Sequence, residues 1–232
     1  AGGHGQGRAL TAMLVATAVW ILLTGMGPLT VFGGILFLAI LIAYCVVTFY
    51  MARKAVATGE DPGVELEEAP KLSLPRSLAY VVLGIGGLVL GAHLIIAGGV
   101  GIAEFYHVPQ EWIGLTLLAI GTSLPEIGAA IAAALRRHGE VAIGNVLGSN
   151  VFNILGAGGI ISLFGPIEIA PTFTHYDHWV MAFAALLIGG FILTRARLGR
   201  LMGILMLLIY AVYIYGLVNG FDILGLFLIP PA

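Results

Sequence analysis

The sequence predicts an all-α, polytopic membrane protein with seven transmembrane helices, and three observations support this fold class. Hydrophobic residues make up 59% and charged residues 9% of the 232 residues, and the mean hydropathy is +1.05. Long apolar runs recur along the chain, and every Lys and Arg lies outside these runs, on one side of the predicted bundle. Soluble domains carry about 25% charged residues, so this composition indicates a chain that lives in a bilayer.

The same composition excludes several function classes. The formal net charge is −2 and no stripe of Lys and Arg is present, so nothing indicates a nucleic-acid partner. Cys45 is the single cysteine, which leaves neither a disulfide framework nor a Cys-based metal site. The chain begins with Ala1 and a Gly-rich stretch that lacks a signal-peptide pattern, and we interpret this start as the cut end of a longer protein.

Seven apolar segments have about the 17 to 25 residues needed to cross roughly 30 Å of hydrocarbon at 1.5 Å per residue. In order along the chain they are Leu10 to Gly25, Leu29 to Met51, Leu78 to Ala103, Trp112 to Leu135, Val141 to Phe164, Trp179 to Thr194 and Leu201 to Val218. Between the second and third segments lies one long polar stretch, Arg53 to Arg76. Its acidic residues lack the spacing of an EF-hand, so we interpret it as a solvated linker. These acidic residues are Glu60, Asp61, Glu65, Glu67 and Glu68.

Threading the seven segments alternately across a membrane separates the charges. All basic residues fall on one face, which the positive-inside rule makes cytoplasmic. They are Arg8, Arg53, Lys54, Lys71, Arg76, Arg136, Arg137, Arg195, Arg197 and Arg200. The opposite face carries only acidic residues, namely Glu104, Glu111, Glu168, Asp177 and Asp222. We therefore expect a multi-pass protein of the plasma (cell inner) membrane.

The fourth segment contains the polar string Gly121-Thr-Ser-Leu-Pro-Glu126. A carboxylate at membrane depth costs several kcal/mol unless something offsets its charge, so Glu126 indicates a ligand. Pro125 lacks an N–H and should kink the helix, which frees the carbonyl oxygen four residues earlier to bind a cation. Thr122 and Ser123 stand four and three residues before Glu126, and this spacing places both hydroxyls near the carboxylate on a helix.

The fifth segment carries the second polar string, Gly144-Asn-Val-Leu-Gly-Ser-Asn-Val-Phe-Asn153. Asn145, Ser149 and Asn153 recur every four residues and form one oxygen-bearing stripe. Carboxylate, hydroxyl, amide and carbonyl oxygens together favour Na⁺, Ca²⁺ or Mg²⁺ over softer metals. Asn145 and Asn150 fit equally well a purely structural role, because Asn in membrane helices also bonds neighbouring helices. We interpret His93 as a hydrogen-bonded packing residue, and His175, Asp177 and His178 as part of a polar loop.

Together, the string from Gly121 to Glu126 and the string from Ala142 to Asn153 resemble an alpha-repeat of the sodium/calcium exchangers, in the calcium:cation antiporter superfamily. The resemblance covers roughly Leu115 to Gly156. It implies a ten-helix antiporter of two inverted five-helix halves, each supplying one alpha-repeat to a central ion site. On that plan residues 1–53 are the last two helices of the first half and residues 54–77 a cytoplasmic loop. Residues 78–232 are the second half, with its alpha-repeat at 112–164.

The resemblance also implies which residues bind the ion. Glu126 matches the principal acidic ligand, Thr122 and Ser123 the ligands before it, and Ala119 a backbone carbonyl ligand for sodium. Ser149 and Asn153 match the ligands on the partner helix. Asn153 departs from several exchangers that carry Asp there, and an amide coordinates without adding charge.

The function implied is antiport of Ca²⁺ against Na⁺ by alternating access, without an enzymatic activity or a resident cofactor. The lipid bilayer and the missing N-terminal helices, which would carry the first alpha-repeat, are the implied partners. Ca²⁺/H⁺ exchange in the same fold and a cation channel with the same ligands remain open alternatives. A retinal photoreceptor would need a lysine in its last helix, and Lys54 and Lys71 both lie in the polar loop. An intramembrane serine protease is disfavoured because Ser123 is not part of a Gly-x-Ser-x-Gly elbow.

Overall fold

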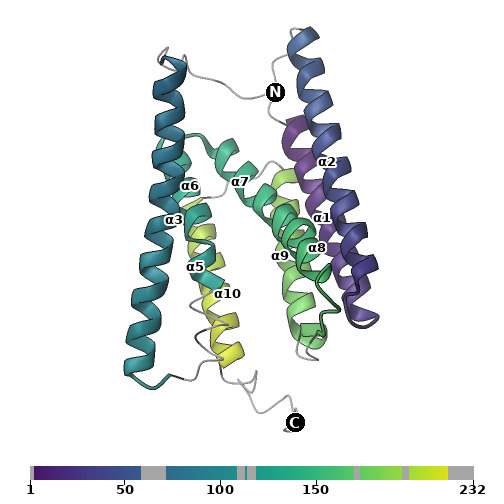
Figure 1. Cartoon of the computed structure of the whole chain (residues 1–232), viewed down its shortest axis with the longest axis vertical. Helices are drawn as coiled ribbons and strands as arrows, with labels where there is room; N and C mark the ends of the chain where they lie inside the picture. The colour runs from purple at the N-terminus through teal and green to yellow at the C-terminus, as the bar shows by residue number, and fades with distance from the viewer. Residues whose placement is uncertain are drawn as a thin grey trace. The chain divides into compact units, whose positions relative to one another are not determined.

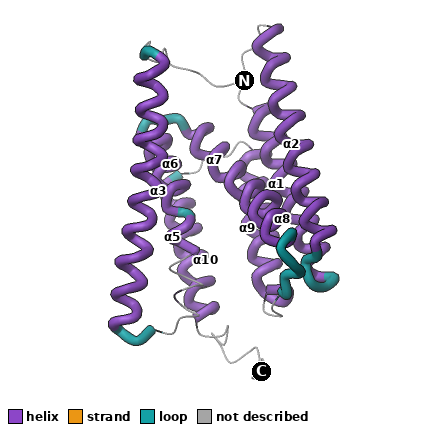
Figure 2. The backbone as a smooth tube through the Cα atoms, viewed as in Figure 1, coloured by secondary structure: helices purple, strands orange, loops and turns teal. Residues whose placement is uncertain are grey.

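A computed structural model of the chain confirms the all-α architecture (Figures 1 and 2). It describes residues 3–58, 72–108, 113, 119–169, 173–194 and 199–218. Within these residues no β-strand is present, and the one β-bridge pairs Leu29 with Ile167. The acidic cluster of the polar linker, the residues at 114–118 in the fourth predicted span, Arg195, Arg197 and Asp222 lie outside the described residues.

Among the described residues, five helices are long and apolar enough to cross a membrane. Their spans are Gly5–Gly25, Val31–Ala55, Leu74–Phe105, Gly139–Ser162 and Phe173–Thr194. The two other predicted spans coincide with shorter apolar helices, Leu124–Leu135 and Arg200–Gly216. Each of the seven predicted segments thus contains a helix, while a count of seven complete spans stays a prediction.

The chain divides into two compact units, each described here by itself. Unit 1 comprises residues 1–71 and 128–196, and unit 2 comprises residues 72–127 and 197–232. The helices of unit 1 are α1 (Gly3–Gly25), α2 (Val31–Thr58), α7 (Gly139–Val151), the π-helix η2 (Phe152–Ala157), α8 (Gly158–Ser162), the π-helix η3 (Phe173–Asp177) and α9 (His178–Thr194). Unit 2 contains α3 (Leu74–Phe105), α5 (Ala119–Thr122) and α10 (Arg200–Val218). The boundary between the units falls inside α6 (Leu124–Leu135).

In unit 1, α1 and α9 pack antiparallel and are tied at both ends. Near one end, Gly189 of α9 lies against the side chain of Leu10, where an added Cβ would be 3.4 Å from Leu10 Cδ1. Near the other end, the buried Thr24 hydroxyl donates to the Trp20 carbonyl (2.6 Å) and lies 3.0 Å from Nε2 of His178. Because the single hydroxyl proton of Thr24 points to Trp20, Nε2 of His178 must be the donor in this pair. This contact satisfies two polar groups that burial would otherwise penalise.

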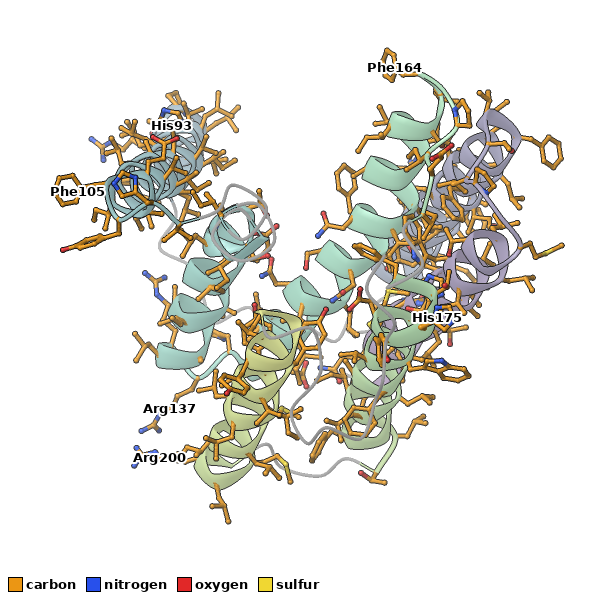
Figure 3. All side chains as sticks on the ribbon, turned by 90° about the horizontal axis from the view of Figure 1, so that it is seen from below. His93, Phe105, Arg137, Phe164, His175 and Arg200 are labelled. Carbon is orange, nitrogen blue, oxygen red and sulfur yellow. The ribbon has the colours of Figure 1, made fainter. Side chains whose placement is uncertain are left out.

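His178 and its neighbours correct part of the sequence interpretation. His175 and Asp177 lie in the π-helix η3, and His178 begins α9, so these residues form helix rather than a loop. Within the described residues no group of three or more His, Cys, Asp or Glu side chains could hold a metal ion. His93 in α3 is exposed and makes no hydrogen bond with the part of the chain that the structure describes, so its prediction as a hydrogen-bonded packing residue is wrong (Figure 3).

The rod formed by α7, η2 and α8 runs antiparallel to α2 and crosses it at glycines. A Cβ on Gly34 would lie 2.8 Å from the Gly159 carbonyl oxygen and would clash with Ser162, and a Cβ on Gly159 would lie 2.9 Å from Leu38 Cγ. The fully buried Ser162 hydroxyl donates to the Gly159 carbonyl (2.9 Å), so its burial leaves no unpaired hydroxyl at this crossing. Small residues let membrane helices approach closely, and dispersion contacts then stabilise the pair.

The packing of unit 1 separates its charged residues into two ends, as the alternating threading predicts. Leu29 and Ile167 exchange backbone hydrogen bonds of 2.9 Å, which join the α1–α2 turn to the segment after α8 that carries Glu168. Arg8 donates to the sulfur of Met51 (2.9 Å), so the start of α1 and the end of α2 meet at the opposite end. The charged residues at the described helix ends of unit 1 therefore separate, with Arg8, Arg53, Lys54, Arg136 and Arg137 at one end and the acidic Glu168 and Asp177 at the other.

We expect Gly34→Ala and Gly159→Ala to lower the thermal stability of the purified protein. Each added methyl group has to push the helices apart at the α2–α8 crossing, and overpacking of this kind costs about 1 to 3 kcal/mol. Gly190→Ala in α9 is the matched control, because nothing lies within 4 Å of its Cβ position. Melting temperatures of the three variants in detergent measure the effect. Equal stability of all three would contradict the tight crossing.

Candidate ion-binding site

The first polar string lies where one helix ends and another begins. α5 ends at Thr122, Ser123 forms a turn, and α6 begins at Leu124 with Pro125 in its first turn. The Ser123 N–H donates to the Ile120 carbonyl (3.0 Å), and the Ser123 carbonyl accepts the Ile127 N–H (3.0 Å). A proline fits the first helical turn because the N–H that it lacks would have no intrahelical partner there. The helix is thus interrupted at one residue, Ser123, close to the predicted position of the kink.

The break changes the geometry that the sequence predicts for the hydroxyls. The expected four-residue helical step from Thr122 to Glu126 is interrupted, because Thr122 closes α5 and Glu126 belongs to the first turn of α6. Thr122 is exposed, whereas Ser123 and Glu126 are half-buried, and each of the three has an interaction partner. Ala119 contributes the first backbone unit of α5. Within unit 2, one short stretch therefore gathers a carboxylate, two hydroxyls and the carbonyls of a broken helix.

Glu126 sits partly out of solvent contact. Its Oε2 atom is buried and accepts no hydrogen bond from the described residues, although the side chain as a whole is not without a partner. A carboxylate in its ionised form offers about four lone-pair positions, so Glu126 has the capacity to coordinate a cation beside the interaction that it already makes.

Gly121 fixes the position of the broken helix inside unit 2. It is buried against α3, where an added Cβ would clash with the Ile96 side chain and lie 2.8 Å from Ile96 Cδ1. Ile is branched at Cβ and cannot swing away without changing rotamer. Glycine at 121 therefore allows the α5 backbone to approach α3. The carbonyl of the same residue lacks its usual helical donor, because Pro125, four residues later, has no N–H.

The second polar string lies on the rod α7–η2 in unit 1, and its two faces differ in chemistry. Leu147, Val151 and Leu155 are buried in the core, with exposed fractions of 0 to 1%. Ser149 is half-buried and its hydroxyl donates to the Val146 carbonyl (3.1 Å). Because the hydroxyl proton is used by the helix itself, both oxygen lone pairs of Ser149 stay available to a cation.

Asn150 and Asn145 have different surroundings. The Asn150 amide donates to the Val146 carbonyl four residues earlier (2.8 Å), so this side chain bonds back to its own helix and fits a structural role. Asn145 is half-buried and also has a partner. Of the two amides that the sequence left open, Asn150 is thereby accounted for by its own helix.

Asn153 lies in a π-helical turn, a feature that the sequence pattern did not reveal. The turn is η2, and its widened hydrogen bonding runs from the Gly158 N–H to the Asn153 carbonyl, five residues earlier. The Asn153 side chain is exposed and makes no hydrogen bond with the described residues. Single π-turns inside α-helices occur frequently at functional sites. Asn145 and Ser149 thus lie one turn apart on the α-helix α7, as the four-residue spacing predicts, whereas Asn153 lies in the wider π-turn.

Comparison with known proteins identifies the family of the chain. A family model described as sodium/calcium exchanger protein matches residues 76–219, which include both polar strings. The chain belongs to the sodium/calcium exchanger family. Among similar proteins, the putative antiporter CaxA of Alkalimonas amylolytica is 32% identical over 84% of this chain. The sodium/calcium exchanger MaX1 of Methanosarcina acetivorans is 34% identical over 60% of it.

Solved structures of this family have the same fold. The sodium-calcium exchanger NCX_Mj, in a crystal soaked with 2.5 mM Na⁺ and 1 mM Sr²⁺, superposes with a TM-score of 0.68 at 30% identity and covers 90% of this chain. The chain spans 66% of NCX_Mj, 60% of CaxA and 40% of MaX1. It therefore corresponds to part of the length of these exchangers.

We expect Gly121→Ala to disrupt the broken helix more than a glycine substitution elsewhere on the same surface. The new methyl group would displace α5 from Ile96 and shift the carbonyls that precede Pro125. Gly98→Ala in α3 is the control, because nothing lies within 4 Å of its Cβ position. Proteolytic sensitivity of the purified protein near residue 123 provides the measurement. Equal resistance of both variants would argue against the close contact between α5 and α3.

Proposed function

We propose that the chain is part of an antiporter that moves Ca²⁺ across a membrane against Na⁺ by alternating access. One observation carries the proposal. The polar strings that mark an alpha-repeat lie on a helix interrupted at Ser123 and on a rod with a π-turn at Asn153, in a chain that belongs to the exchanger family. Interrupted helices bring polar backbone groups to the ion sites of transporters. The helix break supports ion binding by the same residues that carry the family's motif.

The proposed ligands divide by the charge that they bring. Glu126 supplies the one formal negative charge. The hydroxyls of Thr122, Ser123 and Ser149, the amide of Asn153 and the backbone carbonyl of Ala119 supply neutral oxygens. Hard oxygen donors of this kind suit both Na⁺ and Ca²⁺, so the two ions compete for overlapping ligands.

The coordination number implies a second set of ligands. Calcium takes six to eight oxygens at about 2.3 to 2.6 Å. The five proposed side chains supply about five of these with one negative charge, because the Ala119 carbonyl is assigned to Na⁺. In an inverted-repeat antiporter the remaining oxygens come from the opposite half. A second copy of this chain cannot supply them, because every copy inserts with its basic residues on the same side. We therefore propose that N-terminal helices with their own acidic motif complete the site.

The counter-ion follows from how Glu126 loses its Ca²⁺. In Na⁺ exchange the carboxylate stays ionised and Na⁺ replaces Ca²⁺. In Ca²⁺/H⁺ exchange the carboxylate would be protonated in each cycle. Transport measured with Na⁺ and pH varied independently separates these two mechanisms, and strict coupling of opposing fluxes separates both from a channel.

We expect Glu126→Gln to abolish Ca²⁺ exchange while the protein still inserts and folds. The amide preserves the shape of the side chain but removes the charge that offsets half of a divalent ion. The measurement is Na⁺-driven ⁴⁵Ca uptake into liposomes that contain this chain together with the N-terminal helices. Glu140→Gln in the first turn of α7 is the matched control for loss of a carboxylate. Normal exchange by folded Glu126→Gln protein would refute the assignment.

The same liposomes test the half-site argument. The chain reconstituted alone should bind and move little Ca²⁺, whereas co-expression with the N-terminal helices should restore coupled uptake. Robust coupled uptake by the chain alone would show that its own residues form a complete site, and the proposed architecture would have to be abandoned.

The proposed orientation places the basic ends of the helices in the cytoplasm. In a background with Cys45→Ser, Arg136→Cys and Arg197→Cys should react with an impermeant thiol reagent only from the cytoplasmic side. Asp177→Cys should react only from outside. The physical reason is the cost of moving basic flanking residues across the membrane. Labelling of all three positions from one side would overturn the threading.

A further inference from the structure

The π-helical turn that carries Asn153 packs against helices α1 and α2. Leu155, in the middle of the turn, is completely buried, and Gly156, Gly158 and Gly159 line the same side. A Cβ on Gly158 would lie 3.0 Å from Trp20 Cζ3, and one on Gly156 would lie 3.3 Å from Leu41 Cδ2. The glycines thus allow large side chains of α1 and α2 to reach the backbone of the turn.

Trp20 is itself fixed by two interactions. Its ring stacks on Phe37 of α2, with ring centroids 5.9 Å apart and an interplanar angle of 20°. Phe37 is fully buried, and the Trp20 carbonyl accepts the hydroxyl proton of Thr24 (2.6 Å). Stacked aromatic pairs contribute stabilisation beyond the area they bury. Trp20 and Phe37 therefore form a stacked pair, here called the aromatic seat, and the turn packs against its Trp20 ring.

Gly158, which packs against Trp20, also makes the wide hydrogen bond of the π-turn. The Gly158 N–H donates to the Asn153 carbonyl, so Gly158 links Trp20 to the backbone of Asn153 by a packing contact on one side and a hydrogen bond on the other. An added Cβ on Gly158 would also lie 3.8 Å from the backbone carbonyl oxygen of Asn153. A shift of one residue in helical register turns a side chain by about 100° around the helix axis. The position of Gly158 against Trp20 therefore sets the direction in which Asn153 projects.

We propose that Trp20 is a positioning residue for the ion site: the aromatic seat holds the π-turn and thereby aims the Asn153 amide. This inference rests on the proposed function of Asn153 as a ligand. Outer-shell groups orient the direct ligands at metal sites, and their loss typically lowers affinity roughly 10- to 100-fold. Trp20 lies in a helix outside both polar strings, so its role is to fix geometry and not to touch the ion.

The first test measures the turn itself and needs no ion. Hydrogen exchange followed by mass spectrometry compares peptides that cover residues 149–160 in the wild-type protein, Trp20→Ala and Trp179→Ala. Trp179 is the matched control because it is 73% exposed at the start of α9. Trp20→Ala should speed exchange in this peptide, and Trp179→Ala should leave it unchanged. Unchanged exchange in Trp20→Ala would overturn the role of the aromatic seat.

The second test measures transport in liposomes that contain this chain together with the N-terminal helices. Gly158→Ala should raise the ion concentration for half-maximal exchange roughly tenfold at the low end of the outer-shell effect, with little change in maximal rate. Trp20→Phe in the Gly158→Ala background should restore the wild-type value, because the smaller ring makes room for the methyl group. A merely structural defect would instead lower the amount of active protein and the maximal rate.

The two tests separate this inference from the proposed function. If the wild-type protein shows no coupled exchange, the proposed function fails, while hydrogen exchange still decides whether Trp20 holds the turn. If exchange is coupled and Gly158→Ala keeps the wild-type half-maximal concentration, the positioning role is overturned. If Trp20→Phe fails to rescue Gly158→Ala, the contact between these residues does not set the geometry of Asn153, and the inference is wrong.

Discussion

The rest of the structure depends on one constraint: in an apolar surrounding, a polar backbone group needs a partner. A regular helix meets this need internally, which explains why the described residues are helical and why α1, α2 and α3 run for 23, 28 and 32 residues. Such a helix is interrupted where a backbone N–H is missing or where the hydrogen-bonding pattern changes. Pro125 removes one N–H, and the π-turn at Phe152–Ala157 shifts the bonding to five residues. The polar strings lie at these two interruptions, so the places where the backbone is irregular are also where its oxygens become available to an ion.

Glycine serves this constraint in a second way. The close crossings of unit 1 and the contact between Gly121 and Ile96 bring backbone against side chain without a Cβ in between. With no hydrophobic driving force between helices in lipid, such dispersion contacts and a few buried hydrogen bonds must hold the helices together. The pair Thr24 and His178 and the hydroxyl of Ser162 supply those bonds. By contrast, α3 has no buried residue and exposes apolar side chains along its length, as expected of a helix that lies against an apolar surrounding.

Much of this arrangement could be predicted from the sequence because it follows from local chemistry. Hydropathy located a helix in each predicted span, and Pro125 located the break before Glu126. The alternating threading put Arg8 and Arg53 on one face, and the hydrogen bond from Arg8 to Met51 agrees with this placement. The pattern of polar residues carries no signal for the π-turn, and Gly158, whose N–H closes it, packs against Trp20, 138 residues away in the chain. The partners of His178 and Asn150 were missed for related reasons: one is a contact between distant helices, and the other is a choice between equally good acceptors. The ligand set itself stays a prediction that rests on the resemblance.

The amide at Asn153 bears on the charge of the proposed site. Of the ligands proposed for this half, only Glu126 is a carboxylate, and an amide at Asn153 would coordinate without adding a charge. If the opposite half contributes one further carboxylate, the ligands carry two negative charges. One Ca²⁺ or two Na⁺ would then neutralise the site, and a third Na⁺ would leave it with a net positive charge in a medium where unbalanced charge is costly. An aspartate at 153 would remove that excess. In the proposed site, the choice of amide or carboxylate at this one position would therefore set how many monovalent ions can be held near neutrality.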